Sequence, residues 1–407
     1  MGYFKDTARG IFWIGSFRGF TRILSLVKTI LLARLLSPEQ FGVFGVVALT
    51  MSLLEVLTET GVNTVLVQQK GKVTEYINSA WVVSIVRGFG IAFIMVLLSG
   101  PISVFFHIPE SAHLIVLCAV IPIFRGFINP SEVNFQKNLL FKEEFIFRTV
   151  IFSIDAFVSI LLAFILRSPE SLVWGLMVGA LVELILSHIY LNPKPHFNIS
   201  KESISFIVHR GKWLTATGIL DYFIQNGDNI VVGRLLGSTP LGLYQMSYQV
   251  STLPVTEISN ILSKVTFPIF MKISANRKQL FAAYLKTVGV VAVLVGFAAL
   301  ILILFTNTFV SLVLGQKWMS IVPTLRVLAI FAFVKSLVLS SYAYFLAVEK
   351  QEIVTVIPLF AFVAMFVTII PLVNSFGMIG AAVAALIGAL FSMIPVLYFL
   401  LKTQKND

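Results

Sequence analysis

The chain contains a single cysteine, Cys118, and few charged residues. One cysteine cannot form a disulfide within the chain, and it excludes a metal site built from several thiolates. Charged residues make up 12% of the 407 positions, whereas hydrophobic residues make up 57%. Soluble domains carry about twice that share of charge. So little charge cannot cover a water-facing surface, and the composition therefore indicates an integral membrane protein.

The apolar residues form runs long enough for helices that cross a bilayer, each of which needs about 20 residues. Short turns rich in Pro, Gly, Ser and Asn separate the runs. The first run is too long for a signal peptide and lacks a cleavage-type end, so we expect it to remain in the membrane. We predict an all-α polytopic protein with about 12 transmembrane helices, at residues 11–36, 41–67, 79–100, 112–134, 145–166, 171–191, 213–236, 241–271, 284–306, 320–346, 353–373 and 376–401.

The longest hydrophilic stretch, residues 192–212, predicts a linker between two halves of six helices each. The predicted domains are therefore residues 1–200 and 201–407. The apolar segment 204–208 fits either a short interfacial helix or a solvated linker. An internal repeat at an offset of 200 residues supports the division. Its matches are Trp13 with Trp213, Arg34 with Arg234, Leu35 with Leu235, Leu36 with Leu236, and Gly42 with Gly242.

Two six-helix halves have the same sense across the membrane, so a pseudo-two-fold axis along the membrane normal relates them. This layout is typical of transporters, with the site between the halves. Small-residue patterns such as Gly175-x-x-x-Gly179 and Gly380-x-x-x-Ala384 predict close helix packing rather than a site.

The loop lysines and arginines lie mostly on one side of the membrane. The other side carries only Arg34, Arg167, Arg234 and Lys317. Because positive loop residues favour the cytoplasmic side, we predict that both termini and the linker are cytoplasmic and that the chain lies in the inner membrane. The same residues account for the net charge of +11 and suit contact with anionic membrane lipids. No aromatic–basic surface domain indicates a nucleic-acid partner.

The sequence has none of the features expected of a membrane enzyme. It contains no G-x-x-x-x-G-K-[ST] phosphate loop, so we expect no built-in ATPase. A membrane glycosyltransferase or polymerase needs a long extracytoplasmic loop or domain bearing acids, and the predicted outer loops are short. We therefore predict a protein that is not an enzyme and has no catalytic residue, metal or organic cofactor.

Many charged residues fall within the predicted spans. A charge that faces lipid costs roughly 2.5–3.5 kcal/mol, so we expect most of them to face a water-filled cavity or one another. Arg148 and Lys264 lie near cytoplasmic helix ends, and we expect their side chains to reach the interface. The other charged residues within the spans are Arg18, Arg22, Lys28, Arg87, Arg125, Arg326, Lys335, Glu55, Glu59, Asp155, Glu183, Asp221, Asp228 and Glu257.

Helical spacing places several of these side chains on common faces. Asp221, Gln225, Asp228 and Asn229 follow one stripe of the seventh predicted helix, and we expect them to face the space between the two halves. Bases suit an anionic substrate, because guanidinium groups bind phosphate oxygens in pairs. The proposed cavity cations are Arg18, Arg22, Lys28, Arg87, Arg125, Arg326 and Lys335.

Acids in the same cavity are candidates for coupling transport to an H⁺ or Na⁺ gradient. These candidates are Glu55, Glu59, Asp221 and Asp228, together with the amide side chain of Asn229. Structural ion pairs between charges on neighbouring helices, or between Glu257 and Lys264, remain the alternative reading. The spacing of the charges does not decide between the two.

Several short motifs follow one another along the chain, and their order and spacing together are fairly specific. They are residues 32–42 (LARLLSPEQFG), 134–137 (NFQK), 226–237 (NGDNIVVGRLLG) and 241–244 (LGLY), with Leu-Pro at 253–254 and Phe-Pro at 267–268. With these motifs the chain resembles, over nearly its whole length, the Wzx-type polysaccharide and O-antigen flippases. These belong to the polysaccharide transporter branch of the multidrug/oligosaccharidyl-lipid/polysaccharide exporter (MOP) superfamily.

The resemblance implies two six-helix lobes that form a V-shaped cavity. The implied function is a flippase that turns an undecaprenyl-diphosphate-linked oligosaccharide from the cytoplasmic to the outer leaflet by alternating access, in lipopolysaccharide or exopolysaccharide synthesis. The polymerase and export machinery are the expected protein partners. Two alternatives stay open: a drug or cation antiporter of the same superfamily, and a membrane enzyme of polysaccharide assembly, which the short outer loops disfavour.

Overall fold

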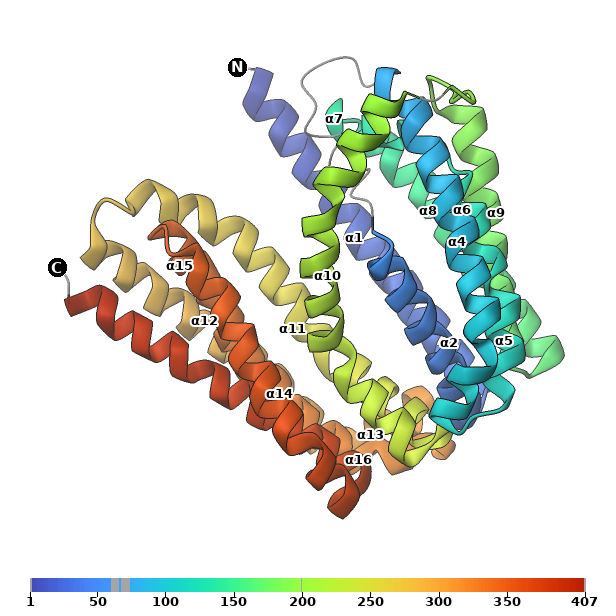
Figure 1. The fold of residues 1–407 in the computed structure, drawn as a ribbon. Helices are drawn as coiled ribbons and strands as arrows, with labels where there is room; N and C mark the ends of the chain where they lie inside the picture. Colours follow the sequence, from blue (N-terminus) through green and yellow to red (C-terminus); the bar gives the residue numbers. More distant parts are fainter. Residues whose placement is uncertain (1, 60–65, 67–73, 199, 406–407) are drawn as a thin grey trace. The chain divides into compact units, whose positions relative to one another are not determined.

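The computed structural model describes the backbone of residues 2–59, 66, 74–198 and 200–405. It also describes their side chains, except those of residues 2–18, 74–75, 201, 203, 205–214, 216, 254–265 and 403–405. In these ranges the chain is helical and forms no strand (Figure 1). Seven described helices are long and apolar enough to cross a membrane, or up to 8 if the bent pair Glu110–Gly126 and Pro130–Lys137 counts as one span. The prediction of an all-α multi-pass membrane protein is confirmed.

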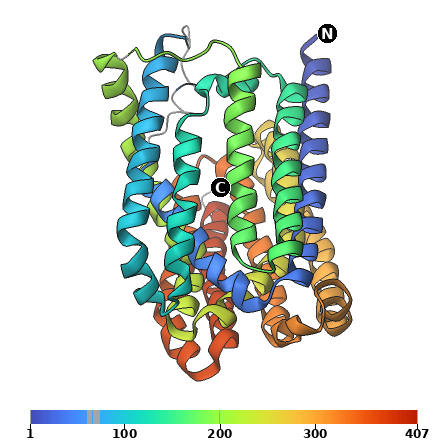
Figure 2. The same ribbon diagram turned by 90° about the vertical axis from the view of Figure 1, so that its right-hand side faces the viewer.

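The chain forms two compact units, Met1–Phe223 and Ile224–Asp407. The helices of the first unit are α1 (Gly2–Leu35), α2 (Pro38–Leu57), α4 (Thr74–Phe106), α5 (Glu110–Cys118), α6 (Val120–Gly126), η1 (Pro130–Glu132), α7 (Val133–Lys137), α8 (Phe141–Leu166), α9 (Glu170–Tyr190) and the start of α10 (Lys201–Leu236). Within this unit α1 packs on α8, α8 on α9, and α6 on both α4 and α9 (Figure 2).

The second unit begins within α10. Its further helices are α11 (Ser238–Ile273), α12 (Arg277–Leu304), α13 (Thr306–Phe309), η2 (Val310–Leu314), η3 (Gln316–Ile321), α14 (Val322–Ser340), α15 (Tyr342–Ala347) and α16 (Gln351–Lys405). α14 lies at its centre, in contact with α11, α12 and α16. Gly377, with a φ of 56°, divides α16 into two helices, in agreement with the two predicted spans 353–373 and 376–401. The predicted limits at residues 200 and 201 stay a prediction.

The hydrophilic stretch 192–212 is only partly a linker. α10 begins at Lys201, so residues 204–208 belong to a long helix and form neither a separate interfacial helix nor a solvated linker. The preceding segment is attached to the start of α4. The backbone N–H of His196 donates to Oδ1 of Asn78 at 2.9 Å, and that of Ser200 donates to Oγ of Ser79 at 3.2 Å.

The internal repeat marks the same helix–turn–helix in both units. Between α1 and α2, Ser37 accepts the Gln40 N–H on Oγ and donates its own N–H to Gln40 Oε1, forming a capping box with Pro38 at the first helical position. Between α10 and α11 the equivalent residue is Gly237, whose φ of 87° suits glycine. The two turns therefore use different chemistry to join equivalent helices.

Candidate substrate cavity of the first unit

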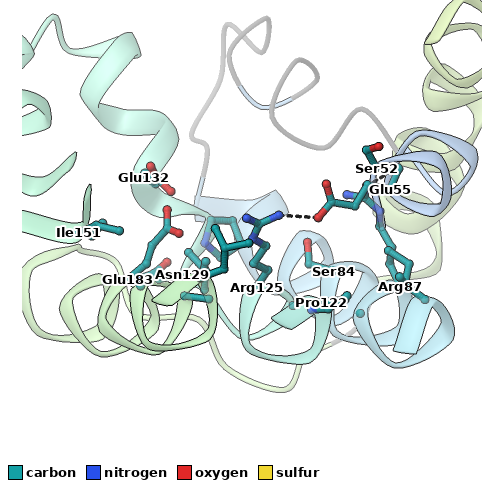
Figure 3. A pocket seen from close by; sticks show the side chains of 18 of the residues that line it. Ser52, Glu55, Ser84, Arg87, Pro122, Arg125, Asn129, Glu132, Ile151 and Glu183 are labelled. Atoms are coloured by element: carbon teal, nitrogen blue, oxygen red, sulfur yellow. Dashed lines mark hydrogen bonds and ion pairs between the residues drawn. The ribbon is translucent and has the colours of Figure 1, made fainter. Parts of the chain in front are cut away.

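The first unit contains an open cavity of about 630 Å³ among α2, α4, α6, η1, α8 and α9. Eight charged side chains line it, five acidic and three basic. They are Glu55, Glu59, Arg87, Arg125, Glu132, Arg148, Asp155 and Glu183. Figure 3 labels five of them, Glu55, Arg87, Arg125, Glu132 and Glu183. The sequence-based expectation that charges within the spans gather around a cavity or pair with one another therefore describes this unit well.

A glycine contact between α4 and α6 positions two of the arginines. A Cβ on Gly88 would lie 2.4 Å from the Pro122 carbonyl oxygen, and one on Gly126 would lie 2.8 Å from the Ser84 carbonyl oxygen. Only glycine allows this approach of the two backbones. Arg87 precedes Gly88 and Arg125 precedes Gly126, so the contact brings both arginines to the same wall of the cavity.

Arg125 and Arg87 both bind the end of α2. Nη1 of Arg125 donates to Oε1 of Glu55 at 2.5 Å (Figure 3). Nη2 of Arg87 donates to the Glu55 carbonyl oxygen at 2.6 Å and lies 3.5 Å from a Glu59 carboxylate oxygen, while its Nε donates to Oγ1 of Thr58 at 3.2 Å. The Arg125 side chain remains 39% exposed, so its guanidinium can be reached from the cavity.

Arg148 lies between two carboxylates. Its Nη1 donates to Oε1 of Glu183 at 2.8 Å, and its Nη2 pairs with Glu132. The expectation that Arg148 extends to the membrane interface is therefore wrong. The bend after α6 brings Glu132 to the start of α8, and no periodic pattern in the sequence indicates this bend.

Lys28 of α1 pairs with Asp155 of α8. Nζ of Lys28 lies 2.8 Å from both carboxylate oxygens, and Ser159 donates its hydroxyl to Oδ1 at 3.2 Å. α9 packs closely against Asp155, because a Cβ on Gly175 would lie 2.9 Å from its carbonyl oxygen and one on Gly179 would lie 3.1 Å from its Cβ. The predicted packing role of these two glycines is confirmed.

The second unit contains a smaller pocket, of about 110 Å³, beside the buried acid Asp228. Asp228 is 3% exposed. Its Oδ2 accepts the Tyr244 hydroxyl at 2.8 Å, and its Oδ1 accepts the backbone N–H of Asn229 at 2.8 Å and the side-chain Nδ2 of Asn229 at 3.0 Å. Three donors therefore satisfy this carboxylate inside the unit.

Lys335 lines the same pocket as Asp228. Its Nζ donates to the Tyr248 hydroxyl at 3.1 Å and lies 5.3 Å from the centre of the Phe331 ring. Aromatic faces stabilise an ammonium group that has left water. The pocket thus holds one acid and one base, each with tyrosine contacts.

The structure brings together only some of the predicted site residues. Glu55, Glu59, Arg87 and Arg125 line the first cavity, and Lys28 adjoins it through Asp155. Asp228 and Lys335 line the second pocket, and Asn229 is buried beside Asp228. Arg22 is not among the residues that line either cavity. Three further predicted residues are exposed: Arg326, Asp221 and Gln225. The structure does not describe the side chains of Arg18, Glu257 and Lys264.

Sequence reasoning missed Glu132 and did not name Arg148, Asp155 or Glu183 among the candidate site residues. Asp155 and Glu183 lie within predicted spans, and their acidic character was the available signal. The expected orientation of the Asp221–Asn229 stripe toward the space between the halves stays a prediction.

Long apolar helices around a charged internal cavity define a membrane transporter. Residues 31–323 match the family model described as "Polysaccharide biosynthesis protein". The chain belongs to this polysaccharide biosynthesis family, and its resemblance to the Wzx-type flippases is confirmed.

The chain is similar to proteins of three bacteria. The chain is 26% identical to an uncharacterized membrane protein in the cps region of Klebsiella pneumoniae, over 93% of this chain and 79% of that protein. It is 27% identical to the lipopolysaccharide biosynthesis protein WzxC of Escherichia coli (strain K12), over 77% of this chain and 64% of that protein. It is 24% identical to the teichuronic acid biosynthesis protein TuaB of Bacillus subtilis (strain 168), over 86% and 73%.

Solved structures show the fold. The chain is similar to the lipid II flippase MurJ in an inward closed conformation, with a TM-score of 0.79 at 14% identity, over 96% of this chain and 87% of that one. It is also similar to an inward-facing multidrug resistance MATE family transporter of the MOP superfamily, with a TM-score of 0.73 at 14% identity, over 95% of both chains. These relatives are transporters rather than enzymes, in agreement with the sequence-based prediction.

Proposed function

We propose that this chain is a flippase that moves an undecaprenyl-diphosphate-linked oligosaccharide from the cytoplasmic to the outer leaflet by alternating access. The observation that carries the proposal is that Arg87 and Arg125 both line the wall of a large cavity, each bonded to Glu55. Guanidinium groups bind phosphate oxygens through paired hydrogen bonds, and a diphosphate presents several such oxygens. The membership of the polysaccharide biosynthesis family supports this cargo.

In the proposed cycle the Glu55 and Glu59 carboxylates occupy the arginines while the cavity is empty. An entering diphosphate replaces these carboxylates as the arginines' partner, so the guanidinium groups never remain unpaired. Transport is coupled to an H⁺ or Na⁺ gradient. The chain lies in the inner membrane with both termini in the cytoplasm, and it passes its cargo to a polymerase and the export machinery.

The test uses proteoliposomes loaded with a lipid-linked oligosaccharide and an enzyme outside that modifies only the exposed sugar. Wild-type protein should bring the inner pool to the outer leaflet. Arg125→Ala should slow this step at least about tenfold at equal protein content, and Arg125→Lys should slow it less, because lysine keeps the charge but loses the paired donors. Absence of flipping by wild-type protein, or normal flipping by Arg125→Ala, would contradict the proposal.

Topology has a separate test. Cysteines introduced as Ser200→Cys and Lys405→Cys should react with a membrane-impermeant thiol reagent only after the cells are opened. The natural Cys118 is buried and gives little background. Labelling of either residue in intact cells would overturn the proposed orientation.

One observation favours a second candidate, a drug or cation antiporter. The cavity is lined by five acids and three arginines, and acids suit cationic cargo. The fold is also similar to a multidrug resistance transporter. Cells producing the chain should then resist cationic drugs, and the resistance should disappear when Glu55→Gln is introduced. The flippase proposal predicts no such resistance.

A further inference from the structure

In the first-unit cavity, every described charged side chain on the wall has a partner of opposite charge, but the acids outnumber their bases by one. Arg125 pairs with Glu55, Arg87 pairs with Glu59, and Asp155 pairs with Lys28 from α1. These three acids each have their own base. The excess acid must therefore lie elsewhere on the wall.

The excess lies at Arg148, which alone serves two carboxylates. Glu132 and Glu183 both pair with its guanidinium, and their side chains are only 18% and 15% exposed. With both acids ionised, this cluster carries a net negative charge with little water to stabilise it. A charge held in such surroundings is costly, and two carboxylates that share one site reduce the cost by sharing a proton.

We infer that the Glu132–Arg148–Glu183 cluster is a proton-binding site that sets the affinity of the cavity for an anionic ligand. The proton forms an O–H bond on Glu132, and no other bond is formed or broken. A metal ion is a poor alternative, because the guanidinium between the two acids would repel it. Among the described residues no group of three or more acids, histidines or cysteines could hold a metal ion.

The neighbouring charges support proton binding at this site. Glu144 lies one turn before Arg148 on α8 and adds negative charge. Arg125 of α6 and Asp155 of α8 each have an opposite charge of their own. Nδ1 of His188 on α9 lies 3.2 Å from the Leu184 carbonyl oxygen. The remaining charged side chains on these elements are Lys137 of α7, Lys142 and Glu143 of the first turn of α8, and Glu170 at the start of α9.

The charge of the cluster decides whether proton binding strengthens or weakens anion binding in the cavity. The protonated cluster is neutral and has guanidinium donors to spare, whereas the deprotonated cluster is negative and repels an anion. Anion binding and proton binding therefore favour each other. As pH rises through the titration of the cluster, affinity for an anionic head group should fall by up to about tenfold per pH unit. This regulatory role rests on the proposed function, but the bound proton does not.

The binding experiment uses purified full-length protein and an undecaprenyl-diphosphate-linked sugar. Its diphosphate is esterified at both ends and lacks the terminal phosphate ionisation near pH 6, so its charge stays constant through the titration. The wild-type Kd should rise with pH. Glu132→Gln and Glu183→Gln should each bind at all pH values about as tightly as wild-type protein at low pH. Both variants leave Arg148 with one carboxylate and should fold. Glu170→Gln, on α9 but outside the cavity lining, is the matched control and should keep the wild-type slope.

An infrared titration without substrate tests the proton directly. Wild-type protein should show a C=O stretch of a protonated carboxylic acid that disappears as pH rises, and the band should be absent from both Gln variants. An unchanged band in both variants, or no such band in wild-type protein, would overturn the inference. Failure of wild-type protein to bind the lipid at any pH, with the infrared band present, would instead count against the proposed function.

Discussion

The two units hold charge in different ways. The first surrounds about 630 Å³ with eight charged side chains in a chain of ion pairs, whereas the second keeps one acid and one base beside a pocket of about 110 Å³. In the first, each base has a carboxylate as its partner. In the second, the partners of Asp228 and Lys335 are tyrosine hydroxyls and aromatic rings.

This difference shows that a shared repeat does not imply a shared role. Both units contain the same helix–turn–helix, yet their close helix crossings differ. In the first unit arginines stand next to Gly88 and Gly126, whereas no arginine stands next to Gly380 or Gly388 in the second. Ion pairs beside a large cavity can exchange partners with a ligand. A carboxylate that is fully hydrogen-bonded and nearly inaccessible is instead suited to holding a structure or a small ion.

The largest expected effect is that of Arg148→Ala, which leaves Glu132 and Glu183 without a base. Stranding buried charge costs roughly 3–5 kcal/mol, so the folded protein should largely disappear from the membrane. The triple variant Arg148→Ala, Glu132→Gln, Glu183→Gln should recover much of the lost amount. Immunoblots of membranes measure the amount of each variant, and thermal unfolding in detergent measures its stability.

The control for Arg148→Ala is Arg326→Ala on α14, whose side chain is exposed. It should leave the protein level unchanged. Equal abundance and stability of Arg148→Ala and Arg326→Ala would show that the ion pairs do not stabilise the first unit. The proposed difference between the two units in how they stabilise charge would then be wrong.

Gly88→Ala should have the next largest effect. The added Cβ would lie 2.4 Å from the Pro122 carbonyl oxygen, and such overpacking costs about 1–3 kcal/mol. Gly90→Ala on the same helix meets nothing within 4 Å and is the matched control. Thermal unfolding should separate the two variants. Equal unfolding temperatures would show that α4 and α6 are not in contact at this point.

Lys335→Met should cost less than Gly88→Ala. It removes a hydrogen bond and aromatic contacts worth about 0.5–2 kcal/mol but keeps most of the side-chain volume. Flipping in proteoliposomes should fall less than in Arg125→Ala, because the second pocket does not offer paired guanidinium donors. A larger loss than that of Arg125→Ala would transfer the main anion-binding role to the second unit.

Asp221→Asn should have the smallest effect, within about 0.5 kcal/mol, because this side chain is exposed. Asp228→Asn on the same helix replaces an acceptor of three hydrogen bonds and should destabilise by about 1–3 kcal/mol. Chemical denaturation of both variants checks the ranking. Equal effects would mean that the buried environment of Asp228 does not distinguish it from Asp221.

The sequence by itself determined the class of the protein. Long apolar runs can only be helices in a bilayer, because every backbone polar group must bond within its own segment. The turns at Ser37 and Gly237 and the break at Gly377 follow from local backbone chemistry, so they too were predictable. The gathering of charges around a cavity followed from the cost of exposing them to lipid.

Only the tertiary structure decided which charges meet. The stripe of Asp221, Gln225, Asp228 and Asn229 reads as one face of a helix, but its two ends lie in different surroundings, exposed and buried. Helical periodicity describes one helix, whereas ion pairs depend on the distance between two. Arg148 meets Glu132 because the chain bends between α6 and α7, and the sequence carries no regular pattern that predicts the direction of such a bend.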